Sequence, residues 1–158
     1  MANTQSMATS FLGELMTATH NFGTAPIRAA STADTFKAAL YLTTATINAS
    51  TTAYSATGEV TGTNYTAGGV TVTNATAPTS TNASATAGVG YWTPSASITY
   101  TTVTLSTAFD CVLIYNSTQS NKAVSVHTFG SQTITAGTFT LTMPSNTTTT
   151  ALLRLATT

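Results

Sequence analysis

Charged side chains are nearly absent from this chain, because four Lys and Arg and four Asp and Glu make up only 5% of its 158 residues. In an ordinary soluble domain, roughly a quarter of all residues are charged. The formal net charge is zero, and the chain lacks the clustered Lys and Arg with which proteins bind nucleic acid or an anionic membrane surface. The sequence therefore argues against both as partners. It favours association with other protein subunits, since a neutral surface provides no charge repulsion between copies.

Threonine supplies about a quarter of the residues, and its branched side chain suits the half-buried surface of a β-strand. A hydrophobic fraction of 42%, with Tyr and Phe spread along the chain, is too high for a disordered protein. The length fits one domain with a single core. The lone Cys111 excludes an internal disulfide, and it stands in the apolar run 109–115, so we expect it in the core.

From residue 35 onward, short runs rich in β-branched and aromatic residues are separated by Gly, Pro and Asn, as is typical of strands and turns. The runs that we interpret as strands are 35–42, 70–73, 97–105, 109–115, 123–129, 132–135, 138–143 and 151–155. The polar stretch 74–90 is expected to be a surface loop. Seven or eight short strands predict an all-β fold, with a single β-sandwich or jelly-roll-like domain over residues 34–158.

Residues 1–33 are expected to form an N-terminal arm with a short amphipathic helix over residues 5–18. Apolar side chains recur in this stretch with the spacing of one helix face. Because so short a helix is marginal alone, its apolar stripe must pack on its own domain or on a neighbouring subunit. Our hypothesis is that the stripe anchors the arm to a neighbour or to a larger shell through Phe11, Leu12, Leu15 and Met16.

Few residues are suited to catalysis or to metal binding. Neither His20 nor His127 has a second His or Cys at a metal-ligand spacing. A Ser-His-Asp arrangement remains open, because Asp110 and His127 fall on strands that we expect to be adjacent, but the chain has no Gly-x-Ser-x-Gly motif. We therefore predict a non-enzymatic protein with no catalytic residues, no metal site and no cofactor.

Tyr91 and Trp92 stand next to the polar stretch 74–90. An exposed aromatic pair offers a sugar ring a large contact area at a small entropic cost. The same pair could instead pack in the core or at a subunit interface. Both residues are therefore interface candidates, and a receptor- or glycan-binding module is the alternative to a purely structural role.

Four segments carry a resemblance, in this order along the chain: DTFKAALY at 34–41, GEV at 58–60 leading to GGV at 68–70, LIYNST at 113–118, and FG at 129–130 followed by AGTFTL at 136–141. Together they resemble small virion structural proteins of tailed bacteriophages, over residues 34–155. The resemblance implies a structural role, first as a capsid decoration or cement protein, with a tail or head-fibre component as the alternative.

The resemblance also implies the partners and the location. The partners would be the major capsid protein and copies of the chain itself, in the simplest case as a homotrimer, and the protein would lie on the capsid surface of the virion. The first residues contain no basic stretch that leads into an apolar segment, and no apolar run approaches 18 residues. We therefore expect synthesis in the host bacterial cytoplasm and no membrane partner.

Overall fold

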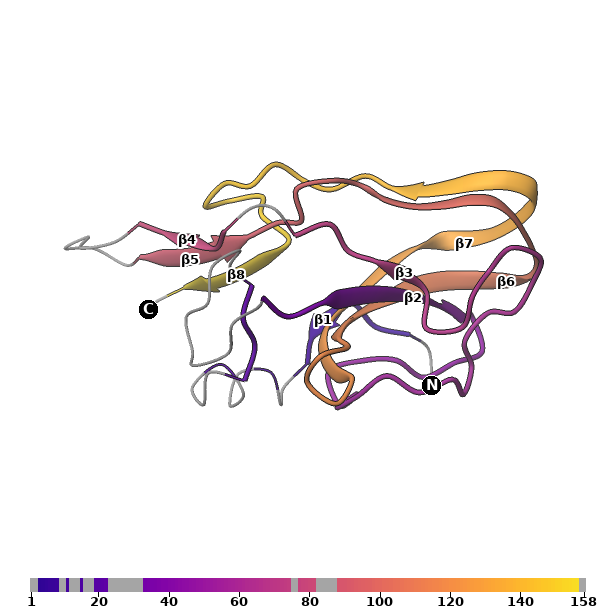
Figure 1. Cartoon of the computed structure of the whole chain (residues 1–158), viewed down its shortest axis with the longest axis horizontal. Coiled ribbons are helices and arrows are strands. Elements are labelled where there is room, and N and C mark those ends of the chain that lie inside the picture. The colour runs from indigo at the N-terminus through magenta and orange to yellow at the C-terminus, as the bar shows by residue number, and fades with distance from the viewer. Residues whose placement is uncertain are drawn as a thin grey trace.

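The structure is a computed structural model, and it describes residues 3–8, 11, 15, 19–22, 33–74, 77–81 and 88–156. These residues form eight strands in two antiparallel sheets (Figure 1), which confirms the predicted all-β, sandwich-like fold. The larger sheet has the strand order β1-β7-β6-β2-β3, and the smaller sheet has the order β4-β5-β8. The strands are β1 (Ser6–Met7), β2 (Phe36–Leu42), β3 (Val70–Thr71), β4 (Thr79–Ser80), β5 (Val89–Trp92), β6 (Ile98–Asn116), β7 (Lys122–Leu141) and β8 (Leu153–Ala156).

The longest strands, β6 and β7, form one hairpin and contain 19 and 20 residues. Five runs predicted from the sequence as separate short strands therefore belong to two continuous strands, which corrects that prediction. The pairing register shifts several times between Tyr100 and Cys111. In the same region Thr102 and Ala136 have positive φ angles of 53° and 47°. Such β-bulges bend a hairpin without ending its pairing. The residues between the predicted runs, which the sequence suggested as turns, therefore lie at bends within continuous strands.

The bend folds the hairpin back over the sheet, and the two layers of the sandwich arise in this way (Figure 1). Near the turn of the hairpin, residues 109–116 of β6 pair with β2. Near its open end, the Tyr100 hydroxyl donates a hydrogen bond of 2.8 Å to the carbonyl of Ala38 on β2. Phe109 and Phe139 meet between the layers, with ring centroids 5.1 Å apart. One face of the sheet is therefore covered by the continuation of its own strands.

Part of the segment 43–69 packs on the opposite face of the sheet, where the ring of Tyr54 stacks on Tyr115 with centroids 4.7 Å apart, whereas Thr63 pairs with Thr104 in the folded-back part of β6. Close approach of the two backbones requires glycine at position 69. The φ angle of Gly69 is +70°, and a Cβ atom there would lie 1.6 Å from the carbonyl oxygen of Ala38. Only glycine accepts both conditions without distorting the chain.

The described N-terminal residues belong to the domain and not to a separate arm. Ser6 and Met7 pair with Val126 and Ser125 as strand β1, so this part of the predicted helix is extended. The Asn3 side chain donates to Asp110 Oδ1 at 2.6 Å and accepts from the backbone N–H of Ile47 at 3.0 Å. Residues 9, 10, 12–14 and 16–18 of the predicted helix lie outside the described residues.

Cys111 is fully buried in β6, as the sequence predicts for a core position. Burial, with a smaller contribution from neighbouring Asp110, raises the pKa of its thiol to about 12. At neutral pH the thiol is therefore protonated and acts as a small apolar group. In the part of the chain that the structure describes, no helix has the length and apolar character needed to cross a bilayer.

Candidate functional site

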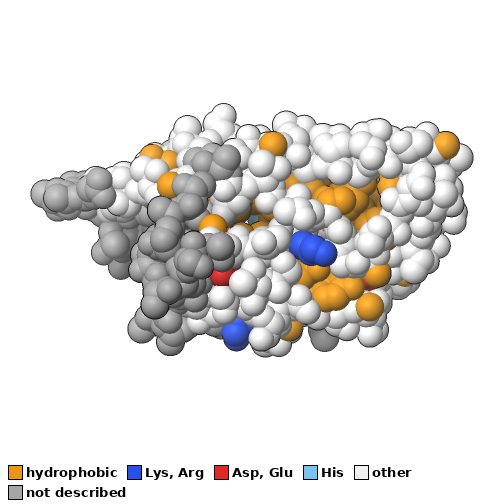
Figure 2. Space-filling view, viewed as in Figure 1, with side chains coloured by type: hydrophobic (Ala, Val, Ile, Leu, Met, Phe, Trp, Pro, Cys, Tyr) orange, Lys and Arg blue, Asp and Glu red, His pale blue; other side chains and the backbone are white. Residues whose placement is uncertain are grey.

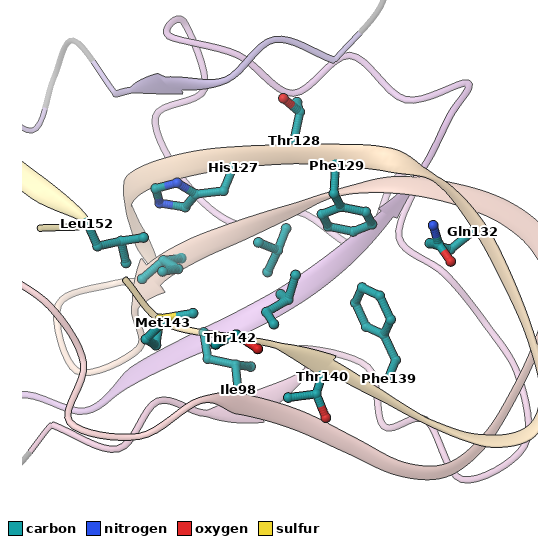
Figure 3. Close-up of a pocket in the computed structure, with 13 residues that line it drawn as sticks. Ile98, His127, Thr128, Phe129, Gln132, Phe139, Thr140, Thr142, Met143 and Leu152 are labelled. Atoms are coloured by element: carbon teal, nitrogen blue, oxygen red, sulfur yellow. The ribbon is translucent and has the colours of Figure 1, made fainter. Parts of the chain in front are cut away.

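A groove of about 270 Å³ enters the sandwich between the two halves of β7, which run along its opposite walls (Figure 3). We refer to it as the β7 groove. Phe129 and Phe139 point toward one another across it, with ring centroids 5.2 Å apart, whereas Thr128 and Thr140 point away from it. None of the described lining residues carries a full charge at neutral pH. An apolar recess with few polar groups is the usual form of a site for a small molecule or for another protein.

His127 stands at one end of the β7 groove, where its ring is paired with a serine two residues earlier on the same strand. The distance between Ser125 Oγ and His127 Nε2 is 2.9 Å. Burial lowers the pKa of His127 to about 4, so the imidazole is neutral at pH 7. Asp110 lies on the adjacent strand, as expected, but its carboxylate accepts a hydrogen bond from Asn3. The described residues thus bring Ser125 and His127 together and direct Asp110 elsewhere.

We expect the free energy of unfolding to fall as the pH drops from 6.5 to 4. His127 in the unfolded chain takes up a proton near its ordinary pKa of 6.5, whereas the folded chain takes it up only near pH 4. The unfolded state then binds more protons in this window, which costs up to about 3 kcal/mol of stability. Urea denaturation at a series of pH values measures the loss, and His127→Gln should remove it. Identical pH profiles for the variant and the wild type would contradict this assignment.

Phe11 and Trp92, two of the predicted interface residues, lie in the protein's own core. They are 2% and 3% exposed, and both contact Phe22, at centroid distances of 5.8 and 4.7 Å. Phe22 in turn stacks on Phe36 at 4.4 Å. The Trp92 indole N–H also donates to Asn74 Oδ1 at 2.9 Å. This corrects the hypothesis that Phe11 anchors the chain to a neighbour, and for Trp92 it favours packing in the core over the alternative of a sugar platform.

Of the other four predicted interface residues, the structure describes two. Leu15 is partly buried and packs against the core. Tyr91 is half-buried on β5, in the small sheet. Leu12 and Met16 lie outside the described residues.

A second polar cluster ties the N-terminal segment to the turn between β6 and β7. Asp34 Oδ2 accepts hydrogen bonds from the Asn116 side chain and from the backbone N–H of Asn21, both at 2.8 Å. His20 Nδ1 lies 3.1 Å from the same Asn116 amide nitrogen. Asp34, Asn116 and His20 are all buried, so their hydrogen bonds hold the N-terminal segment against the turn between β6 and β7. Within the described ranges, no group of three or more His, Cys, Asp or Glu is arranged to hold a metal ion.

The third polar cluster, around Glu59, could not be found from the sequence. The Glu59 side chain is buried, and its carboxylate accepts hydrogen bonds from the Tyr54 and Tyr65 hydroxyls, at 2.7 Å each, and from the Gly68 N–H, at 2.8 Å. Burial and the hydrogen bonds to Glu59 raise the pKa of both tyrosines, so both remain donors at neutral pH. The Leu40 N–H donates to the Tyr65 oxygen at 3.0 Å. This cluster therefore connects the segment 54–68 to β2.

The signals for these sites differ in kind. Ser125 and His127 are spaced by two on a predicted strand, which places both on one face, so their pairing was open to sequence reasoning. The partners of Glu59 are five to nine residues away in a segment without regular periodicity, and no spacing rule brings them together. Comparison with protein-family models, with curated proteins and with solved structures finds no match to this chain.

Proposed function

We propose that this protein is a non-enzymatic structural component of a tailed-phage virion, most simply a capsid decoration or cement protein. The observation that carries the proposal is an almost uncharged surface on a well-packed β-domain. On the face shown in Figure 2, the described surface is mostly uncharged polar groups and backbone, with hydrophobic patches and only a few charged side chains. Such a surface is poorly protected against association, and it suits a protein that functions in permanent contact with other subunits.

The physical task of a cement protein fits this surface. It strengthens a shell by burying area at the joints between subunits, and symmetry repeats each contact many times. Contacts of this kind depend on shape and on buried area, and they need no single strongly charged or catalytic site. The polar clusters of Asp34 and Glu59 face inward and stabilise the domain itself, which leaves the surface free for such contacts. The partners under this proposal are the major capsid protein and further copies of the chain.

The alternative of a receptor- or glycan-binding fibre component loses its main support. It relied on an exposed aromatic platform at Tyr91 and Trp92, and Trp92 is 3% exposed with its indole N–H bonded to Asn74. Tyr91 alone, half-buried on a four-residue strand, offers a small contact area. The cement function is therefore the better supported of the two.

Quantitative mass spectrometry of purified virions tests the proposal through the copy number per particle. We expect hundreds of copies, because a cement protein occupies repeated positions on the capsid lattice. A few to a few dozen copies would instead indicate the tail or fibres. Absence from the particles would reject both virion roles.

A further inference from the structure

We propose that the open outer edge of β7 is a self-association surface, where two copies of this chain pair β7 against β7 in antiparallel fashion around a two-fold axis. This pairing would also bring the two β7 grooves together. The inference rests on the proposed function, which requires contacts between copies, and it names the surface that makes one of them. The argument depends on the backbone of β7, its side-chain composition and the apolar groove beside it.

Among the described residues, β1 and Ala8 cover the outer edge of β7 over only a short part of its length. Strand β1 pairs with Ser125 and Val126, and the Val124 carbonyl accepts from the N–H of Ala8 at 3.1 Å. Because successive residues of a strand direct their hydrogen-bonding groups to alternate sides, Thr128 directs its N–H and C=O to the same side as Val124. The chain before Ser6 leaves the sheet, since the Thr4 N–H donates to the Ile47 carbonyl. Within the described part of the chain, β1 therefore ends before it reaches Thr128.

The exposed edge lacks the features that usually prevent pairing between sheets. Natural edge strands carry Lys or other charged residues, or Pro, at such positions. Residues 127–141 contain no Asp, Glu, Lys, Arg or Pro, and burial keeps His127 neutral at pH 7. The segment also contains five Thr and two Phe, which favour strands. An edge of this composition is suited to pairing with another strand.

The β7 groove adds apolar area next to this edge. Several of the hydrophobic residues at the groove are only partly buried within one copy; they are Phe129, Phe139, Leu141, Met143 and Leu152. The described groove residues carry no charge, and the chain as a whole has no net charge. Two such grooves can therefore face each other without electrostatic repulsion, whereas a strongly basic or acidic partner would find no counter-charge there.

Symmetry favours a second copy as the occupant, and a two-fold axis as the arrangement. In an isologous pair the hydrogen-bonding groups of each β7 edge are satisfied by the other copy, so neither copy keeps an open β7 edge. A head-to-tail contact would leave one edge free on each new copy and would continue as a ring or a fibre. A homotrimer, the simplest assembly at a threefold position of a shell, cannot be built from this isologous contact alone.

Sedimentation equilibrium over a range of protein concentrations tests the inference with two matched variants. Gly130 is exposed, and a Cβ atom there would meet nothing within 4 Å, so Gly130→Lys places a charge beside the edge without disturbing the fold. Thr57→Lys adds the same charge at an exposed position outside β7, in the segment 43–69. We expect a dimer for the wild type and for Thr57→Lys, and a dissociation constant at least tenfold higher for Gly130→Lys.

Hydrogen exchange of the Thr128 amide gives a second readout that reports the edge itself. We expect this amide to exchange more slowly at concentrations where the wild-type dimer forms, and the slowing should disappear in Gly130→Lys. A wild type that stays monomeric, a trimer, or a dimer in which Thr128 exchanges at the monomer rate would each overturn the inference. Virions that contain hundreds of copies of a protein that is monomeric in solution would leave the proposed function standing and reject only the β7 contact.

Discussion

Replacement of Glu59 by alanine should lower the free energy of unfolding by about 4 kcal/mol. The carboxylate accepts three hydrogen bonds, from the Tyr54 and Tyr65 hydroxyls and from the Gly68 N–H. A hydrogen bond to a charged group contributes about 1.5–3 kcal/mol, and a buried donor left without a partner costs a similar amount. The expected loss is a large share of the 5–15 kcal/mol that typically separates a folded domain from its unfolded chain.

Urea denaturation of Glu59→Ala, followed by circular dichroism, measures this loss. Tyr54→Phe removes one of the three hydrogen bonds and leaves the carboxylate in place, so we expect a smaller decrease, of about 1.5 kcal/mol. Tyr91→Phe is the matched control, because Tyr91 lies on the small sheet away from Glu59, and it should change stability by under about 0.5 kcal/mol. If Glu59→Ala were as stable as Tyr91→Phe, the Glu59 cluster would not be a structural anchor.

The strands were predictable from the sequence because their signal is local. Alternating apolar and polar residues identified 35–42 and 123–129, and a continuous apolar run identified 109–115; the structure contains β2, β7 and β6 there. The sequence could not show whether the chain turns or only bends between these runs, because a Gly or Ser between two strand-like runs is compatible with a turn or with a β-bulge. The choice depends on whether the partner strand continues alongside, which is information from a distant part of the chain.

The packing of the N-terminal segment could not be deduced for a related reason. The spacing of Phe11 and Leu15 indicates an apolar face that must pack against another surface. The same spacing is compatible with packing within the chain or against another subunit. Which of the two occurs depends on Phe22, Phe36 and Trp92, which leave space for the Phe11 ring in the folded domain. Likewise, the burial of Glu59 depends on how the segment 54–68 closes over β2.

Replacement of Trp92 by alanine should destabilise the domain by about 4–5 kcal/mol, because it removes a large buried side chain and leaves a cavity. The ring contacts Phe22 at 4.7 Å and Phe36 at 6.2 Å, and the loss of its N–H leaves Asn74 Oδ1 without this donor. Trp92→Phe keeps part of the aromatic contact and loses the hydrogen bond, so its decrease should be about half as large. Thermal and urea denaturation measure both values.

The same pair of variants separates a core tryptophan from one that binds a ligand. A side chain that is 3% exposed contributes to the stability of the fold, so any effect of Trp92→Ala on particle binding should follow the fraction of unfolded protein. Tyr91→Phe, at the neighbouring half-buried position, should leave stability nearly unchanged and provides the control. If Trp92→Ala kept full stability and lost adhesion to host cells or glycans, the tryptophan would be a binding residue, and the fibre alternative would replace the cement proposal.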